Sequence, residues 1–129
     1  MLIPGKTATA CTVVSNNNTA KAVGSGQLDV FATPMMVALM EQAACECLAD
    51  ALDAEQTSVG SAINVEHVAA SPIGAKITAT AVIEHVDGRK IELSVCASDG
   101  FGEIGRGKHT RIVIDSRWFM SKLAETKGQ

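Results

Sequence analysis

An apolar helix in the first half of the chain is the feature that most limits its possible folds. The pair Thr33-Pro34 predicts the helix start, with threonine as the N-cap and proline as the first helical residue. From there to about Leu52 the segment is rich in alanine and apolar on nearly every side. We therefore expect this helix to be buried rather than half exposed.

Strand patterns dominate the rest of the chain. Alternation of apolar and polar residues predicts one strand before the helix and four strands after it. The expected strands are residues 7–14, 59–68, 76–85, 89–98 and 103–114. Asp87-Gly88 is expected to form a two-residue hairpin turn. Residues 19–29 are expected to be an irregular loop, and residues 118–122 a short closing helix.

This order of elements predicts an α+β hotdog fold, in which a curled antiparallel sheet wraps around one long buried helix. The 129 residues suit a single domain that spans residues 1–129. A sheet of this size covers only part of the helix, and an exposed edge strand can pair with a second copy. We therefore expect at least a homodimer, and a dimer of dimers stays open.

Composition and charge argue against several classes of partner. Hydrophobic residues make up 47% of the chain, which is too many for a disordered protein. The net charge of −3 and the lack of a basic face argue against nucleic acid as a partner. No apolar run has the length that would cross a membrane. The first residues lack the pattern of a secretory signal, so we expect the cytoplasm.

The four cysteines show no spacing that is typical of a zinc or redox site. They are Cys11, Cys45, Cys47 and Cys96. We expect free thiols that fill small spaces in the core, and a cysteine nucleophile paired with His67 stays open as an alternative. No metal and no tightly held cofactor is expected.

Glu41 is unusual because it is a carboxylate inside the apolar helix. No lysine or arginine lies three or four residues away, so its partner must come from elsewhere in the fold or from another chain. His67 shares a strand face with Ile63 and Val65 and should point inward. Taken singly, His67 could be a satisfied core group and Thr33 only a helix cap. Together, a buried acid, a histidine and a hydroxyl are the groups that acyl transfer requires.

The spacing of these residues indicates a site shared between subunits. Eight helical residues separate Thr33 from Glu41, which is about 12 Å along the axis. Either water and substrate fill this gap, or Thr33 of one subunit works with Glu41 of its mate, which is our hypothesis. The backbone N–H groups of Met35 and Met36 could hold an acyl carbonyl oxygen. Gly60 marks either a simple bulge or a place where a ligand or another backbone comes close.

Three segments resemble hotdog thioesterases of the fluoroacetyl-CoA thioesterase type. They are residues 30–41, 58–74 and 103–111, within a likeness that covers roughly residues 30–114. The spacing of threonine, glutamate and histidine agrees as well. The resemblance implies an acyl-CoA thioesterase that hydrolyses a small acyl-CoA to the free acid and coenzyme A. Coenzyme A would then enter only as part of the substrate.

The resemblance also implies roles for single residues. Thr33, Glu41 and His67 match the catalytic triad of that family, Gly60 matches its glycine at the acyl thioester, and Arg111 matches a substrate-binding arginine. By this reading Glu41 is the base or nucleophile, His67 moves protons to the departing thiolate, and Thr33 orients the water or the acid.

Two points remain open within this reading. From the sequence alone Arg111 could be an exposed strand charge, or it could join Arg106 and Lys108 in binding coenzyme A phosphates. Residues 21–29 look shorter than in the fluoroacetyl-CoA enzyme and lack its lid phenylalanines, so we expect a short generic acyl group. A hotdog enoyl-CoA hydratase and a non-catalytic acyl-CoA-binding protein are the alternative functions.

Overall fold

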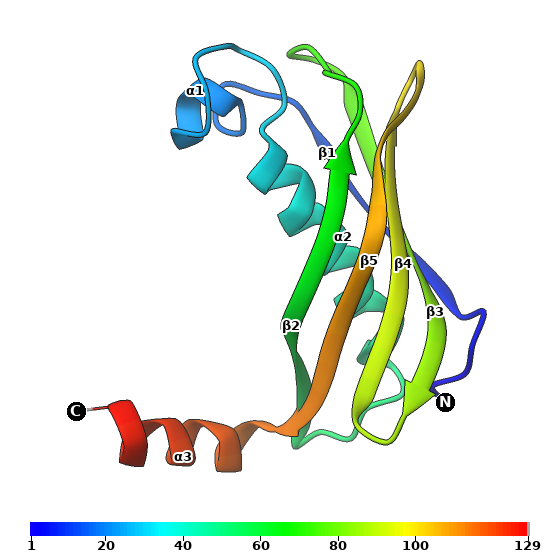
Figure 1. Cartoon of the computed structure of the whole chain (residues 1–129), viewed down its shortest axis with the longest axis vertical. Coiled ribbons are helices and arrows are strands. Elements are labelled where there is room, and N and C mark those ends of the chain that lie inside the picture. The colour runs from blue at the N-terminus through cyan, green and yellow to red at the C-terminus, as the bar shows by residue number, and fades with distance from the viewer. Residues whose placement is uncertain (129) are drawn as a thin grey trace.

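A curled sheet and the long helix that it encloses make up most of the protein (Figure 1). The computed structural model describes residues 1–128. In chain order, the elements are β1 (Thr7–Val13), α1 (Ala20–Val23), α2 (Thr33–Ala49), β2 (Gln56–His67), β3 (Lys76–Asp87), β4 (Lys90–Asp99), β5 (Gly102–Asp115) and α3 (Ser116–Lys127). The α+β hotdog architecture predicted from the order of the elements is confirmed.

The five strands form one antiparallel sheet in the order β1-β3-β4-β5-β2. The strand bounds agree with the predicted ones to within a few residues at each end. The predicted hairpin turn is displaced by one residue, because Asp87 still pairs with Lys90 and the turn consists of Gly88 and Arg89. Gly88 takes the positive φ of 59° that such a turn requires. β1 and β2 are the two edges of the sheet.

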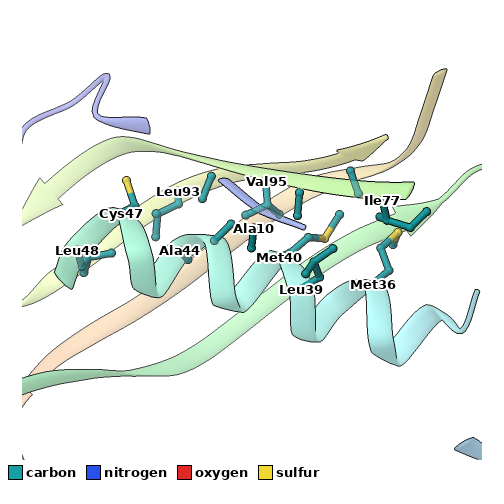
Figure 2. Close-up of a cluster of buried hydrophobic side chains, with 14 of the residues drawn as sticks. Ala10, Met36, Leu39, Met40, Ala44, Cys47, Leu48, Ile77, Leu93 and Val95 are labelled. Atoms are coloured by element: carbon teal, nitrogen blue, oxygen red, sulfur yellow. The ribbon is translucent and has the colours of Figure 1, made fainter. Parts of the chain in front are cut away.

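α2 lies along the concave side of the sheet and buries one face against it (Figure 2). Its buried side chains recur at helical spacing and are Met36, Leu39, Met40, Ala43, Ala44, Cys47 and Leu48. They meet apolar residues of the inner sheet face such as Ile77 and Leu93. The opposite face, with Ala38 and Glu46, is exposed. One sheet covers only part of the helix, as expected from its size, so the predicted full burial of α2 is not reached within a single chain.

The start of α2 differs from the prediction by one residue. Ala32 is the N-cap, and Thr33 is already helical. The Ala32 carbonyl accepts hydrogen bonds from the N–H groups of both Met35 and Met36, each at 3.0 Å. These two amides are therefore not free to hold an acyl carbonyl oxygen, contrary to our expectation. Because Thr33 caps nothing, its hydroxyl is available for another partner.

Two helices depart from the predicted pattern. The predicted loop after β1 contains the short helix α1, which Thr19 caps by accepting a hydrogen bond from the Ala22 N–H at 3.1 Å. The closing helix α3 is longer than predicted, and it starts earlier because the Asp115 side chain caps it at the Trp118 N–H. α3 buries no residue and projects away from the body beyond the β2 edge (Figure 1). None of the described helices is long and apolar enough to cross a membrane.

Replacement of Met40 by alanine should test the contact between α2 and the sheet. Met40 is fully buried, so Met40→Ala should lower the free energy of unfolding by about 2–5 kcal/mol. The matched control is Glu46→Ala on the exposed face of the same helix, which should change stability by less than about 0.5 kcal/mol. Urea unfolding followed by circular dichroism measures both. Equal losses in the two variants would contradict this packing.

Candidate active site

A threonine and a histidine meet where α2 begins and β2 ends. The Thr33 Oγ1 lies 2.7 Å from the His67 Nδ1, which is hydrogen-bond distance. The inward orientation predicted for His67 is confirmed, because its ring reaches the helix on the concave side of the sheet. The structure thus brings together two of the three predicted catalytic residues within one chain.

The other ring nitrogen of His67 is buried and has no hydrogen-bond partner within residues 1–128. Burial lowers the pKa of His67, and the nearby Ala69 backbone only partly opposes this effect. The imidazole is therefore neutral at pH 7 and can exchange a proton. An unpaired Nε2 is the atom to which a water or a substrate group could bind.

A small hollow lies beside this pair. Its volume is about 280 Å³, and its lining includes Thr33, His67, Phe31 and Ala70. Ala20 of α1 and Ser25 of the following loop complete one side of it. This volume is just below the range of about 300–1,000 Å³ for drug-sized ligand sites, so the space suits a small group. The hollow gives a ligand access to the Thr33 hydroxyl and the His67 ring.

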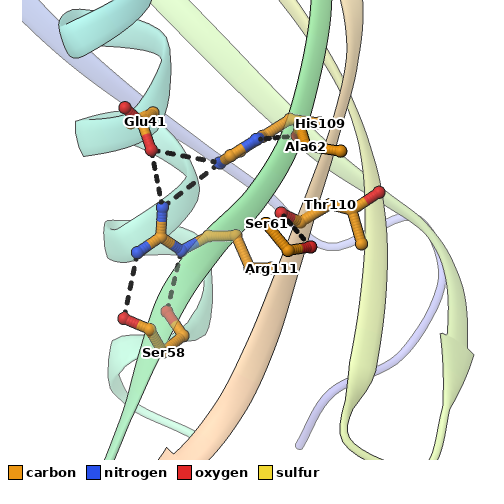
Figure 3. Close-up of polar contacts among 7 residues, drawn as sticks. All are labelled: Glu41, Ser58, Ser61, Ala62, His109, Thr110 and Arg111. Carbon is orange, nitrogen blue, oxygen red and sulfur yellow. Dashed lines mark hydrogen bonds and ion pairs between the residues drawn. The ribbon is translucent and has the colours of Figure 1, made fainter. Parts of the chain in front are cut away.

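Glu41 occupies a separate place on α2 (Figure 3). Its side chain is 41% exposed, so the expectation of a buried carboxylate is wrong for the single chain. Its partner comes from elsewhere in the fold, as expected: Arg111 Nη1 lies 3.3 Å from the Glu41 Oε2. The His109 Nε2 lies 3.8 Å from the same oxygen. Within one chain, the described hydrogen bonds do not connect Glu41 to either Thr33 or His67.

Gly60 gives the Glu41 carboxylate its space on β2. A Cβ atom at position 60 would lie 2.5 Å from the Glu41 Oε2, so any side chain there would force the carboxylate to move from its present position. The register between β2 and β5 also shifts between Gly60 and Ala62, which is the bulge that we left open. The bulge at Gly60 is confirmed, the group that approaches it within one chain is the Glu41 carboxylate, and the close approach of a ligand stays a prediction.

Arg111 is buried, not an exposed strand charge. Its Nε donates to the Ser58 Oγ at 2.8 Å, and its Nη2 donates to the Ser58 carbonyl at 3.0 Å. Arg106 and Lys108 lie on the other face of β5, where they line a different hollow of about 540 Å³. Arg111 therefore does not form one phosphate-binding group with them. Its guanidinium contacts the Glu41 carboxylate instead.

The sequence reasoning missed His109, which joins Glu41 and Arg111 in this network (Figure 3). His109 is 2% exposed, and burial is the main cause that lowers its pKa. The sequence could have indicated His109, because residues two apart on a strand share a face and Arg111 was already a candidate site residue. Ser58 was also missed, although it lies two residues before Gly60.

The cysteines do not form a second reactive centre. Cys47 is buried and donates to the Lys6 carbonyl, whereas Cys11 and Cys45 are exposed, so only part of the expected filling role is confirmed. The hydrogen bond of His67 is with Thr33 rather than with a thiol. Residues 1–128 contain no group of three or more side chains arranged to hold a metal ion.

Comparisons with known proteins agree with this geometry. The family model described as fluoroacetyl-CoA-specific thioesterase matches residues 14–117. A fluoroacetyl-CoA thioesterase from Streptantibioticus cattleyicolor is 43% identical over 97 residues, which cover 75% of this chain and 70% of that protein. The chain belongs to the family of fluoroacetyl-CoA-specific thioesterases. This membership confirms the predicted resemblance and the predicted class of enzyme, an acyl-CoA thioesterase that acts on a small acyl-CoA.

Solved structures of thioesterases extend this likeness to nearly the whole chain. A structure of a fluoroacetyl-CoA thioesterase is 35% identical and has a TM-score of 0.91 over 98% of both chains. A variant of such an enzyme in complex with fluoroacetate and CoA is 37% identical, with a TM-score of 0.86 over 92% of this chain and 99% of its own. A hot-dog-like protein from Thermanaerovibrio acidaminovorans is 26% identical and has a TM-score of 0.88 over 98% of this chain and 93% of its own.

The two buried histidines should make folding stability depend on pH. Burial lowers the pKa of both His67 and His109, whereas histidines in the unfolded chain titrate near about 6.5. Below that value the unfolded chain binds more protons than the folded chain, so the free energy of unfolding should fall as the pH drops from about 7.5 to about 5.5. Urea unfolding at several pH values measures this. The double variant His67→Asn/His109→Gln should show a flatter dependence, and an unchanged slope would contradict the assignment.

Proposed function

We propose that the protein hydrolyses a short acyl-CoA at a site that two subunits form together. Thr33 and His67 of one subunit and Glu41 of the other would be the catalytic residues. The observation that carries this proposal is that the predicted triad is divided into two clusters. One is Thr33 with His67 at the start of α2, and the other is Glu41 with Arg111 farther along the helix. Neither cluster alone has the acid, the histidine and the hydroxyl that acyl transfer requires.

A second copy has two surfaces to which it could bind. Within residues 1–128, β2 pairs only with β5, so the outer edge of β2 has unpaired backbone groups that can pair with another strand. The exposed face of α2 lies beside that edge and includes alanine at positions 38 and 49. A symmetric dimer uses the same surface on both copies, which a strand edge allows when it pairs with itself in the antiparallel direction. These features support a homodimer, and a dimer of dimers stays open.

One register of this pairing would bring the two groups of catalytic residues together. If the two-fold axis passed between Ile63 and Asn64, positions 60 and 67 would lie opposite each other, because they are equally far from that point. His67 of one subunit would then face Gly60 of its partner, where the Glu41 carboxylate lies. The Cα atoms of directly opposite residues on antiparallel strands are about 4.5–5.5 Å apart. This pairing would complete two identical sites in one dimer.

The chemistry follows from the groups that would meet there. The Glu41 carboxylate would act as base on a water molecule or as nucleophile on the thioester carbonyl, and the C–S bond would then break. The neutral His67 ring, whose Nε2 is unpaired, would accept a proton released by the attacking water and pass it to the departing thiolate, so that it ends the reaction neutral again. The Thr33 hydroxyl would orient the water or the acid. Gly60 and Arg111 would lie beside the acyl thioester, with Arg111 opposing the charge of Glu41.

The small hollow and the short segment before α2 support a short acyl group. The lining beside Thr33 and His67 consists largely of small residues, such as Ala69 and Ala70. Coenzyme A would enter only as part of the substrate, and the reaction needs no metal or bound cofactor. The cysteines are free thiols, which is the usual state in the cytoplasm, and we propose that compartment.

A thiol-release assay over a panel of short acyl-CoA substrates tests the activity. The wild type should release free thiol, and Glu41→Gln should lower kcat by about 10²–10⁴-fold, because glutamine can neither take a proton nor attack. Glu46→Gln on the exposed face of the same helix is the matched control and should keep wild-type activity. An undiminished rate in Glu41→Gln would remove Glu41 from the mechanism.

The same panel separates the two alternative functions. An enoyl-CoA absorbance assay run in parallel would lose signal without thiol release if the protein were a hydratase. Tight binding of acyl-CoA without either change would instead identify a non-catalytic acyl-CoA-binding protein.

Mixed dimers test whether the site is shared. Thr33→Ala and Glu41→Ala chains should each be inactive alone, and random pairing should restore about a quarter of the wild-type activity. This fraction arises because half of the dimers are mixed and each mixed dimer has one intact site. The chains are unfolded together, refolded and assayed for thiol release. If the mixture stays as inactive as its parents while mixed dimers are present, the site belongs to one chain.

A further inference from the structure

His109 is a buried polar residue to which the proposed reaction assigns no role. Its side chain is 2% exposed and lies on the inner face of β5, between β2 and α2. Both of its ring nitrogens have hydrogen-bond partners. The Nδ1 lies 2.8 Å from the Ala62 carbonyl oxygen, and the Nε2 lies 3.2 Å from Arg111 Nη1 (Figure 3).

These two partners require the same tautomer of the ring. A carbonyl oxygen only accepts hydrogen bonds, so the His109 Nδ1 must carry the hydrogen. A guanidinium only donates, so the Nε2 must be the unprotonated acceptor. Burial and the nearby Arg111 cation both lower the pKa of His109, which keeps the ring neutral. The imidazole is thus set as a donor at one end and an acceptor at the other.

The acceptor end of His109 controls where Arg111 directs its hydrogens. Ser58 binds the Nε and Nη2 of the guanidinium, at 2.8 and 3.0 Å. Nη1 has two hydrogens, and its two acceptors are the His109 Nε2 at 3.2 Å and the Glu41 Oε2 at 3.3 Å. With one hydrogen bound to His109, the planar guanidinium directs the other toward the carboxylate.

We propose that His109 is a positioning residue for Glu41. As a neutral acceptor it fixes Nη1 of Arg111, and Nη1 in turn holds the Glu41 carboxylate at Gly60 in the orientation that the reaction needs. Glu41 is half exposed and could otherwise take several rotamers. This inference rests on the proposed role of Glu41 in thioester hydrolysis. It assigns to His109 no contact with the substrate.

Two substitutions separate positioning from general support of the fold. In His109→Asn the side-chain amide can still donate to the Ala62 carbonyl, but nothing replaces the acceptor at the Nε2 position. In His109→Gln the longer side chain can place its amide oxygen near that position and accept from Arg111 again. Thermal unfolding of both variants measures their stability.

The kinetic result expected is a loss of kcat that the glutamine variant reverses. His109→Asn should lower kcat by about 10–100-fold with KM changed less than about 3-fold, since a misplaced carboxylate affects the chemical step rather than binding. His109→Gln should recover at least about 10-fold of that loss. A His109→Asn enzyme with wild-type kcat, or a glutamine variant as slow as the asparagine variant, would overturn the proposal.

A measurement that needs no activity keeps the test separate from the proposed function. Long-range ¹H–¹⁵N NMR on the wild-type protein reports which ring nitrogen of His109 carries the hydrogen. We expect Nδ1–H with an unprotonated Nε2 at neutral pH, and an Nε2–H tautomer or a charged ring would overturn the inference. If the wild type released no thiol from any substrate, the proposed function would fail, and the tautomer would still decide the state of His109.

Discussion

The contact between one face of α2 and the curled sheet is the constraint on which the rest of the structure depends. Met36, Met40 and Leu48 bury that face, so the rotation of the helix about its axis is fixed. This rotation directs Thr33 toward the end of β2 and Glu41 toward its middle, beside Gly60. The core therefore sets the positions of both polar clusters without taking part in their chemistry.

Each of the two clusters lacks something that the other has. The Thr33–His67 pair has a hydroxyl and a neutral ring, but no carboxylate to activate water or attack a carbonyl. The Glu41 cluster has the carboxylate, and Arg111 opposes its charge. Within one chain, however, Glu41 lies about two helical turns from Thr33 along α2. A dimer that pairs through the free edge of β2 would bring the Glu41 carboxylate of one subunit to the Thr33–His67 pair of the other. In the proposed dimer, assembly and catalysis would then depend on the same strand.

The pattern of the sequence was sufficient for most of the fold, because periodicity reports burial directly. Alternation along β3 and β4 predicted their paired faces, and the alanine-rich segment after Thr33 predicted α2. The predictions were wrong where local composition permits more than one backbone conformation or packing. Threonine is a common N-cap, yet Ala32 takes that place, and the Thr33 hydroxyl is instead within hydrogen-bond distance of His67, 34 positions later. The partial covering of α2 was expected from the size of the sheet, but apolar composition does not state which side of the helix the sheet covers.

The sequence by itself determined which residues have reactive groups and which strand or helix face each occupies, since both follow from residue type and local period. It therefore identified Thr33, Glu41 and His67 as candidates and required a partner for the carboxylate. Only the tertiary structure decided which groups meet. It brought Arg111 and His109 from β5 to Glu41 and left His67 with Thr33, because contacts between residues far apart in the chain depend on how the sheet curls around the helix.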